Sequence, residues 1–396
     1  MNIETLSQFY DIMDSTIKIR RDLVNAYYQG KLFAEQSVSQ LKEVLFTLER
    51  ISSDQKECIL KVSEEMNMTI DLSYEIDELK KDILFLEMDK NHFLNHLYAD
   101  DSNMKKEVQD GVEFLKGIKF DNFISDRDGT INNYCGRYRS SIQSVYNSIY
   151  ISNFSNLMKN AVILTSAPLD DIGLIDISVD RPGVFIYAGS KGREYLDKDG
   201  IKKSFPIKQE KQNKLNEFNM LLKDFLKSSD NHIFTLIGSG LQFKFGQTTI
   251  ARQDINGSIS SQKSKAFLDS IQEMIKEIDP EDHFFRIEDT GKDIEVILTI
   301  EGSDSESSKD FDKGDGVTFL NQELDLKLGS SSNLICGDTF SDLPMVVSSM
   351  EYNNQTCAVF VTKDISLKEK VKQACPNSVF VSKPDVLVCL LKELSG

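Results

Sequence analysis

The chain of 396 residues lacks the features that mark membrane-spanning and secreted proteins. No apolar run approaches the roughly 20 residues that a membrane-spanning helix needs. The first stretch, MNIETLSQFYDIMD, carries acidic residues and no apolar segment, so it does not resemble a signal peptide. The six cysteines are scattered without a CxxC pair, a usage typical of reduced thiols rather than of a disulfide framework. We therefore expect a cytoplasmic protein without a membrane span.

Positive charge is scarce as well. The chain has 46 Lys and Arg residues against 63 Asp and Glu residues, which gives a formal net charge of -17. A surface with this excess of negative charge repels a polyanion, so we expect no nucleic-acid partner. A small anionic substrate remains compatible with this charge, because a few cations can dominate a single pocket. The sequence does not fix an oligomeric state.

Proline and glycine are rare in the first part of the chain, where no proline precedes Pro168 and a long glycine-free stretch follows Gly30. Apolar residues recur there at helical intervals, as at Ile76, Leu79 and Ile83. This pattern predicts an N-terminal three-helix bundle within residues 1–115, and the bundle is a candidate binding site for a protein partner. The three helices are predicted at about 3–29, 32–51 and 54–98.

Beyond residue 115, short apolar runs alternate with helical stretches, which indicates an α/β domain. Five runs are predicted as strands of this core: 122–125, 161–164, 334–336, 358–361 and 379–381. A second group, several with the alternation of a half-exposed sheet, indicates a smaller α+β unit: 183–187, 234–237, 241–245, 248–251 and 294–300. The polar stretch 302–312 is predicted to be a connector. We therefore predict a core of residues 116–169 and 306–396 with an inserted domain of residues 170–305.

Two acids follow the first predicted core strand, in the sequence Asp126-Arg-Asp128-Gly129-Thr130. Because they lie two residues apart at a strand end, the turn that Gly129 permits brings both into one site. A carboxylate can attack phosphorus and form an aspartyl phosphate. Its neighbour can protonate the leaving oxygen and later activate water. The motif is short, and an acidic turn that caps a helix would also explain it.

Three further motifs follow along the chain. The predicted strand 161–164 leads to Thr165 and Ser166, whose hydroxyls can hydrogen-bond a phosphoryl oxygen. Lys313, next to a glycine, can neutralise phosphoryl charge. Asp338 and Asp342 follow another strand and present two carboxylates to a hard cation such as Mg²⁺. Taken singly, each motif has an ordinary explanation as a strand end, a solvated turn or a helix cap.

In their order along the chain, these motifs resemble those of the haloacid dehalogenase superfamily of phosphatases. The resemblance implies a Rossmann-like core and a Mg²⁺-dependent reaction. It implies that Asp126 is the nucleophile and Asp128 the general acid/base. It also implies that Thr165 and Lys313 stabilise the phosphate. The implied ligands of Mg²⁺ are Asp126, the backbone carbonyl of Asp128, Asp338 and Asp342.

The position of the inserted domain narrows the resemblance to one group of phosphatases within the superfamily. The interval between Asp126 and Thr165 is too short for a cap domain, whereas the interval between Thr165 and Lys313 can hold one. An α+β cap at this place, called a C2-type cap, resembles the cap of sugar-phosphate phosphatases. Such caps close over the site, exclude water and recognise the leaving group through hydrogen bonds to its hydroxyls.

Within the predicted cap, the sequences GLQFKFG and IEVIL resemble cap strands of trehalose-6-phosphate phosphatases. That family usually carries Glu-x-Lys on the first strand and Glu on the second. Gln242, Lys244 and Glu295 stand at these places, so the glutamine departs from the family pattern. Arg193 and Arg252 are further cations predicted near the mouth of the site. A solvated surface position is the alternative for each of these residues.

The runs 132–140 and 246–252 look specifically like the roundworm branch of that family, and the N-terminal helices resemble a microtubule-interacting and transport domain. The resemblance implies hydrolysis of trehalose 6-phosphate to trehalose and phosphate. Two alternatives stay open, a phosphatase for another sugar phosphate and a scaffold whose helices recruit partners. Because all four motifs lie beyond residue 115, we expect the helices to be removable without loss of the phosphatase.

Overall fold

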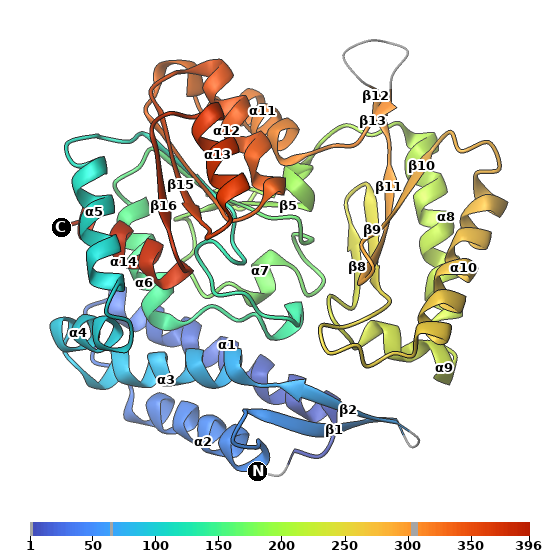
Figure 1. Cartoon of the computed structure of the whole chain (residues 1–396), viewed down its shortest axis with the longest axis horizontal. Coiled ribbons are helices and arrows are strands. Elements are labelled where there is room, and N and C mark those ends of the chain that lie inside the picture. Colours follow the sequence, from blue (N-terminus) through green and yellow to red (C-terminus); the bar gives the residue numbers. More distant parts are fainter. Residues whose placement is uncertain (1–2, 64–65, 302–307) are drawn as a thin grey trace.

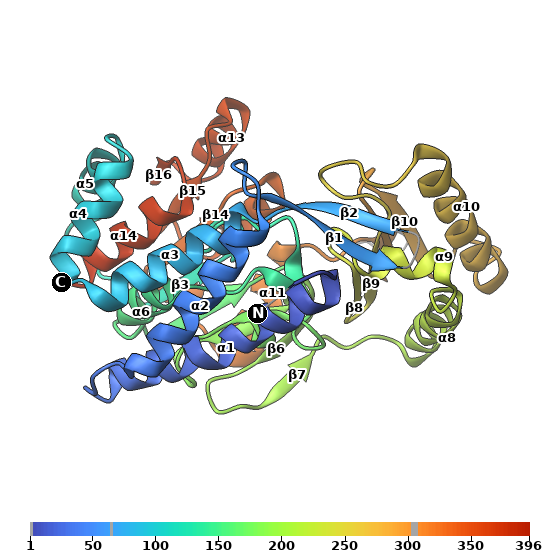
Figure 2. The same cartoon turned by 90° about the horizontal axis from the view of Figure 1, so that it is seen from below.

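The computed structural model describes residues 3–63, 66–301 and 308–396. The described chain has three parts, which are helices near the N-terminus, a core around a large sheet, and a smaller sheet domain beside it (Figures 1 and 2). None of the described helices is long and apolar enough to cross a membrane.

The N-terminal part is helical, as predicted, but differs in detail. Two predicted helices are present as α1 (Leu6–Tyr28) and α2 (Glu35–Ile51). The single helix predicted over 54–98 is wrong, because an antiparallel hairpin of β1 (Glu57–Ser63) and β2 (Met66–Asp71) occupies its first part. Three shorter helices follow: α3 (Ser73–Glu87), α4 (Lys90–Asp100) and α5 (Met104–Leu115).

Burial along the hairpin explains this difference. Cys58 and Leu60 are buried, whereas Ile59 between them is 70% exposed, which is the two-residue period of a strand. The helical spacing holds only from α3 onward, where Ile76 and Leu79 are buried. The strand signal is therefore local and lies within the segment that we expected to be one helix.

A sheet of eight strands forms the core, in the order β16-β15-β14-β3-β4-β5-β6-β7. Strands β16 to β5 are parallel, whereas β6 and β7 are antiparallel to their neighbours. The five predicted core strands are confirmed as β3 (Asn122–Ser125), β4 (Asn160–Leu164), β14 (Asn333–Gly337), β15 (Thr356–Val361) and β16 (Ser378–Val381). The others are β5 (Ile186–Gly189), β6 (Glu194–Leu196) and β7 (Lys202–Ser204).

Helices cover both faces of this sheet, as expected for a Rossmann-like α/β core. One face carries α6 (Val145–Ser155) and α14 (Pro384–Leu394), and the other carries α11 (Lys313–Leu324), α12 (Leu343–Tyr352) and α13 (Ile365–Ala374). A short helix, α7 (Leu174–Ile177), follows β4. The predicted α/β fold class is confirmed.

The pairing of β5 does not follow the predicted division at residue 170. We expected the run at 183–187 in the inserted unit, but β5 pairs with β4 and β6 in the core sheet. The local sequence favours a strand, whereas tertiary contacts decide which sheet it joins. The exact domain limits stay a prediction.

The smaller domain holds a four-stranded antiparallel sheet in the order β10-β11-β9-β8. Its strands are β8 (Leu241–Lys244), β9 (Gln247–Ala251), β10 (Phe285–Asp289) and β11 (Asp293–Leu298). Helices α8 (Gln209–Phe225) and α10 (Ser261–Ile278) cover one face of this sheet, and the other face is turned toward the core (Figure 1). A short helix, α9 (Ser229–His232), precedes β8. This arrangement is the predicted α+β cap.

Two further predictions concern segments at the cap's edges. The strand predicted at 234–237 is wrong, because Ile233–Thr235 form a 3₁₀ turn and Phe234 stacks on Phe267 of α10. The predicted connector at 302–312 has its residues 302–307 outside the described part. A short pair, β12 (Ile300–Glu301) and β13 (Ser308–Lys309), flanks them.

Buried ion pairs join the N-terminal helices to the core. Asp82 of α3 accepts a hydrogen bond from Arg20 of α1 at 2.6 Å and another from the backbone N–H of Val145, at the start of α6. Glu75 of α3 accepts hydrogen bonds from Arg137 of the core. These helices are therefore packed onto the core through charged contacts, and their removal without loss of the phosphatase stays a prediction.

Candidate active site

Three of the four motifs follow neighbouring parallel strands. Asp126 follows β3, Thr165 follows β4 and Asp338 follows β14, and β3 lies between the other two strands. The carboxyl ends of parallel strands meet at one edge of a sheet, so these side chains gather there. The Asp126 N–H donates to the carbonyl of Cys336 at 3.0 Å, which ties the two acidic motifs together.

The turn after Asp126 requires glycine at position 129. Gly129 has φ +87°, and a Cβ there would lie 2.2 Å from a carboxylate oxygen of Asp338. The next residue, Thr130, donates its hydroxyl toward Asp126 Oδ2 at 3.2 Å and Asp338 Oδ1 at 3.1 Å. The turn therefore lets two carboxylates approach each other and gives them a shared donor.

Lys313 lies between two of the aspartates. It begins α11, whose N-cap Asp312 accepts hydrogen bonds from the N–H groups of Gly314 and Asp315. The Lys313 ammonium lies 2.5 Å from Asp126 Oδ1 and 2.5 Å from Asp342 Oδ1. Burial alone would lower the pKa of Lys313, but the two carboxylates raise it above its ordinary value. The lysine is therefore a fixed positive charge in the site.

The aspartates carry more negative charge than Lys313 can balance. Burial, together with the nearby Asp342, raises the pKa of Asp126 to about 7, although Lys313 opposes this shift. Burial and the charge of Asp126 raise the pKa of Asp338 to about 9. Asp342 behaves differently, because Lys313 and two backbone N–H groups outweigh its burial and hold its pKa below the ordinary value. A cation beside Asp126 and Asp338 would relieve this imbalance.

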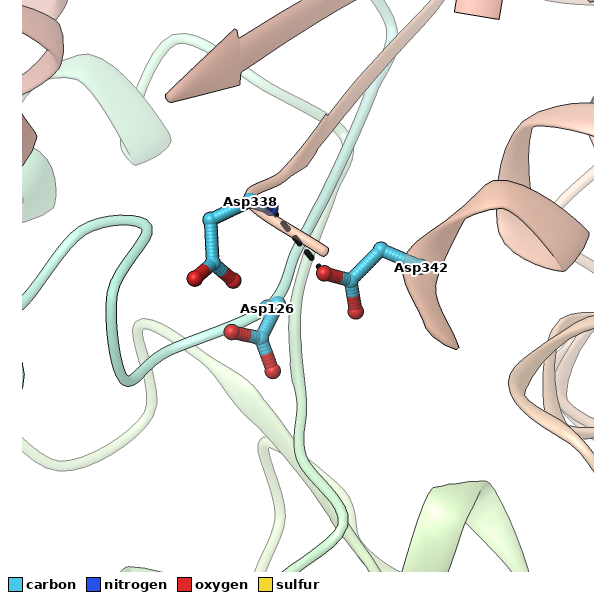
Figure 3. A group of neighbouring side chains, drawn as sticks. All are labelled: Asp126, Asp338 and Asp342. Carbon is cyan, nitrogen blue, oxygen red and sulfur yellow. Dashed lines mark hydrogen bonds between the residues drawn. The ribbon is translucent and has the colours of Figure 1, made fainter. Parts of the chain in front are cut away.

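The three aspartates can hold a metal ion. Asp126, Asp338 and Asp342 each offer a carboxylate oxygen, and these oxygens lie within 4.8 Å of one another (Figure 3). Asp342 is already engaged through both oxygens, Oδ1 by Lys313 and Oδ2 by the N–H groups of Asp338 and Thr339 at 3.0 and 2.9 Å. An oxygen-only set of donors fits a hard cation. In the described structure Asp338 Oδ2 has no hydrogen bond, and Asp126 Oδ2 is bonded only by the Thr130 hydroxyl, so these two oxygens are the candidates for direct coordination.

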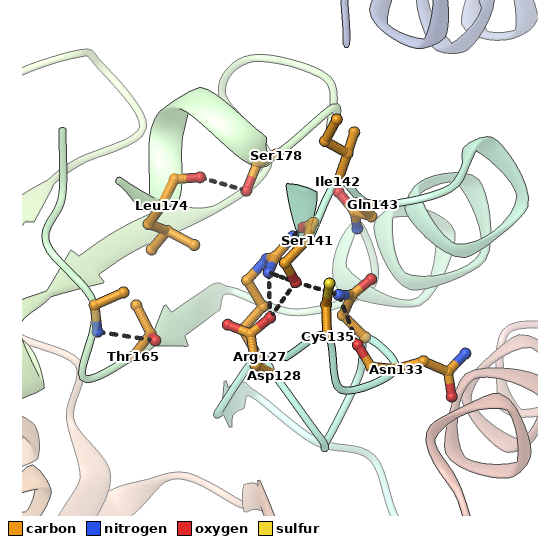
Figure 4. A network of polar contacts seen from close by, with 12 residues as sticks. Arg127, Asp128, Asn133, Cys135, Ser141, Ile142, Gln143, Thr165, Leu174 and Ser178 are labelled. Atoms are coloured by element: carbon orange, nitrogen blue, oxygen red, sulfur yellow. Dashed lines mark hydrogen bonds and ion pairs between the residues drawn. The ribbon is translucent and has the colours of Figure 1, made fainter. Parts of the chain in front are cut away.

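Asp128 is held by a separate network (Figure 4). Its Oδ1 accepts hydrogen bonds from Arg127 at 2.5 Å and from the Ser141 hydroxyl at 2.7 Å. Arg127 is itself buried and also donates to the Ser141 carbonyl at 2.6 Å. The side chain of Asp128 is 20% exposed and lies at the cavity beside Asp126. This network fixes Asp128 while leaving it open to a bound molecule.

A cavity of about 280 Å³ lies between the core and the cap. The predicted residues that line it are Asp126, Asp128, Thr165, Lys313 and Asp338 from the core and Gln242 and Lys244 from the cap. Ser166 also lines it, whereas the Thr165 hydroxyl accepts a hydrogen bond from the Ala167 N–H. Burial lowers the pKa of Lys244. The structure thus brings the four motifs and the cap strand β8 to a single cavity.

The other three predicted cap-side residues lie outside this lining. Arg193 is buried and donates to the carbonyls of Gly246 at 2.6 Å and Leu298 at 3.2 Å, and its burial lowers its pKa to about 10. Arg252 pairs with Asp289 at 2.8 Å. Glu295 accepts a hydrogen bond from Gln247 at 2.9 Å and lies 3.9 Å from the Lys191 ammonium. Their part in substrate binding stays a prediction.

The cavity is also lined by cap residues that the sequence did not single out, among them Ser239, Asp254, Lys292 and Asp293. Asp293 lies two residues before Glu295 on β11, so both side chains point to the same face of the sheet. This two-residue alternation was visible in the sequence. Ser239 and Lys292 lie in turns, where no periodic pattern marks them.

Comparison with known proteins gives a consistent set of relatives. Residues 123–387 match the family model described as trehalose-6-phosphate phosphatase, C-terminal, and residues 5–120 match the model of the N-terminal helical bundle domain of these phosphatases. A trehalose-phosphatase of Brugia malayi is 28% identical over 99% of this chain and 86% of its own length.

An alpha,alpha-trehalose-phosphate synthase (UDP-forming) 1 of Aphelenchoides avenae is 31% identical over 98% of this chain. The match spans 35% of that protein, so the chain corresponds to about a third of its length. Among solved structures, a trehalose-6-phosphate phosphatase related protein aligns over 69% of this chain with a TM-score of 0.47 and 13% identity. A structural likeness this weak supports no further conclusion.

Proposed function

We propose that this chain, which belongs to the trehalose-6-phosphate phosphatase family, hydrolyses trehalose 6-phosphate to trehalose and phosphate. The observation that carries this proposal is the contact of Asp126 with Lys313, in a cavity that the cap also lines. A buried carboxylate beside a fixed cation suits a nucleophile that attacks a phosphoryl group. The similarity to the Brugia malayi trehalose-phosphatase over nearly the whole chain supports the choice of substrate.

In the first step, a carboxylate oxygen of Asp126 attacks phosphorus in line and the bond between phosphorus and the sugar oxygen breaks. Lys313 and Thr130 hold the two oxygens of Asp126 and so set the direction of attack. Asp128 donates its proton to the departing sugar oxygen, and trehalose leaves as a neutral alcohol. The products of this step are an aspartyl phosphate and an ionised Asp128.

In the second step, Asp128 takes a proton from water, and the water oxygen attacks phosphorus. The bond between Asp126 and phosphorus breaks, which restores the Asp126 carboxylate and releases phosphate. Arg127 and Ser141 hold Asp128 at the same place in both steps, so one residue serves as acid and then as base.

Charge on the phosphoryl oxygens is balanced from two sides. Lys313 supplies a positive charge, and the Thr165 or Ser166 hydroxyl supplies a hydrogen bond. Mg²⁺ bound by Asp126, the backbone carbonyl of Asp128 and Asp338, with Asp342 behind them, would neutralise the remaining charge. The oxygen-only donors of this cluster support Mg²⁺ over a softer metal ion.

Further proposals concern the cap and the whole chain. Gln242 and Lys244 would contact the sugar, because both line the cavity, while Glu295 and Arg252 could contribute only from beside it. We propose the division into residues 1–115, a core of 116–169 and 306–396 and a cap of 170–305, with residues 186–204 reassigned to the core sheet. Six cysteines without disulfides support a cytoplasmic location.

Phosphate release from a panel of sugar phosphates tests the proposed function. The panel contains trehalose 6-phosphate, sucrose 6-phosphate, glucose 6-phosphate and a small aryl phosphate, each with Mg²⁺ and with a chelator. We expect the highest kcat/KM for trehalose 6-phosphate and no turnover with the chelator. A higher value for another sugar phosphate would replace the proposed substrate, and chelator-resistant turnover would contradict the metal site.

A further inference from the structure

The face of the cap sheet that is turned toward the core is polar. Cross-strand pairing places Gln242, Thr249 and Glu295 in one row across β8, β9 and β11, so their side chains share a face. The opposite face is covered by helices, as shown by the hydrogen bond between Thr248 and Asn219 of α8. Any cap residue that binds the sugar must therefore lie on the face turned toward the core or in the turns beside that face.

The carboxylate of Glu295 on this face is already engaged. Gln247 of β9 donates to it at 2.9 Å, and Lys191 of the core lies 3.9 Å away. Close to Lys191, the hydroxyl of Ser190 accepts a hydrogen bond from the N–H of Phe245 in the β8–β9 turn. Glu295 thus lies where the cap rests on the core.

Asp254 and Asp293 are the described cap carboxylates that line the cavity. Asp254 is used within its own loop, where its oxygens accept hydrogen bonds from the N–H groups of Asn256 and Ser258 and from the Ser258 hydroxyl. Asp293, the first residue of β11, accepts a hydrogen bond from the Ser239 hydroxyl through Oδ1. In the described structure no donor bonds its Oδ2.

We propose that Asp293 is a specificity-determining residue that accepts a hydrogen bond from a hydroxyl of the sugar remote from the phosphate. This inference rests on the proposed function. The half-buried carboxylate lies near Lys244 and Lys292, whose positive charges oppose the rise in the pKa of Asp293 that its burial causes. Ser239 is a positioning residue, because its hydroxyl occupies one carboxylate oxygen and leaves the other for the ligand.

The chemistry suits a neutral, hydroxyl-rich leaving group. A carboxylate is an acceptor only, so it selects a donor such as a sugar hydroxyl and rejects an ether or an aryl ring. A site built to bond a hydroxyl discriminates strongly against a ligand that lacks it, because the carboxylate is then left without a partner. A small aryl phosphate ends before the cap and makes no use of Asp293.

Steady-state kinetics of the full chain tests this proposal. We expect D293A and D293N to raise KM for trehalose 6-phosphate by about tenfold or more, with kcat within about threefold. The kcat/KM for p-nitrophenyl phosphate should stay within about twofold. S239A should raise KM for the sugar phosphate less than D293A does, and S239T should restore it. The matched control is D269N, which removes an exposed carboxylate that pairs with Lys265 on α10.

The outcomes separate this inference from the function on which it rests. An unchanged KM for trehalose 6-phosphate in D293A, or equal losses on both substrates, would overturn the role of Asp293 alone. A wild-type protein that cleaves the aryl phosphate but not trehalose 6-phosphate would overturn the proposed function and this inference together. If circular dichroism shows that D293A is unfolded, D293N and S239A give the same readout.

Discussion

At the scale of single residues, Asp126 and Asp128 have different surroundings, which suits the different roles proposed for them. Asp126 is buried and touches Lys313, so its carboxylate is held in one orientation beside a cation. Asp128 is more exposed and is held by Arg127 and Ser141 instead. Two carboxylates in one short motif therefore have different surroundings, as a nucleophile and a proton carrier require.

Replacement of Asp126 by Asn should abolish turnover and leave the fold intact. The amide is nearly the same size but cannot form the acyl phosphate, and Asp342, the other carboxylate that contacts Lys313, is absent from the cavity lining. We expect kcat/KM for trehalose 6-phosphate to fall by at least about three orders of magnitude, with an unchanged circular dichroism spectrum. Activity within about tenfold of the wild type would contradict the assigned role of Asp126.

The sequence predicted much of the core of this site, and the reason is local. Each of the four motifs follows a strand or begins a helix, so its placement depends on short-range structure and on the order of parallel strands. Of the predicted cap-side residues, Gln242 and Lys244 line the cavity, whereas Arg193, Arg252 and Glu295 do not. Whether the Arg193 side chain faces the cavity or the β8–β9 turn depends on how the cap packs on the core, which no local pattern encodes.

At the scale of elements, the segment between β5 and β6 holds the cap against the core through hydrogen bonds. Ser190 accepts a hydrogen bond from Phe245, and Arg193 donates to Gly246 and Leu298, at the two places where the cap strands approach the core. Gly192 packs against α11, since a Cβ there would lie 2.7 Å from the Cα of Gly316. Residues 186–196, which we placed within the cap from sequence, thus belong to the core sheet and contact the cap from there.

Replacement of Arg193 by Ala should lower stability rather than substrate affinity. It removes a large buried side chain together with one hydrogen bond to each of two carbonyls, which costs about 3 kcal/mol of unfolding free energy. Denaturant unfolding measures this loss, with the half-exposed Lys202→Ala as control. Normal stability combined with a raised KM for trehalose 6-phosphate would show instead that Arg193 binds substrate.

The contrast between predicted and observed elements has a physical basis. Strands such as β14 and β15 are buried on both faces, so their continuous apolar runs are easy to detect. The hairpin of β1 and β2 is partly exposed and carries charged residues, which weakens its signal against the helical pattern that follows. The sheet that β5 joins is decided by contacts far along the chain.

At the scale of the whole molecule, the N-terminal helices bridge the other two parts. Tyr10 of α1 donates to the Leu236 carbonyl of the cap at 3.1 Å, and Asn256 of the cap donates to the Thr69 carbonyl of β2 at 3.3 Å. Figure 2 shows the hairpin reaching from the helices toward the cap. The buried pair of Arg20 with Asp82 and the contacts of Glu75 fix the same helices to the core.

Removal of residues 1–115 should therefore destabilise the phosphatase, contrary to the expectation from sequence. The truncated chain would leave Arg137 without Glu75 and would expose the apolar face of α14 that packs on α5. Breaking a buried ion pair alone costs about 3–5 kcal/mol. We expect the fragment to be insoluble or to unfold well below the full chain in a thermal melt. A fragment as stable as the full chain would show that the interface contributes little.

A milder variant tests the same interface in the intact chain. Glu75→Gln keeps the shape of the side chain and weakens its contacts with Arg137 and Ser140. We expect a loss of about 1–3 kcal/mol in unfolding free energy with kcat unchanged. The exposed Glu113→Gln on α5 is the control and should be neutral.

The central claim is that the phosphoryl group passes through Asp126, and trapping the intermediate tests it most directly. Asp128→Asn should still be phosphorylated by a labelled aryl phosphate whose leaving group needs no proton, but should hydrolyse the phosphoenzyme slowly. After an acid quench, we predict close to one hydroxylamine-labile phosphate per chain, on the peptide that contains Asp126 and absent when Asp126 is also replaced by Asn. Turnover without label on the protein, or label on a different residue, would contradict the account.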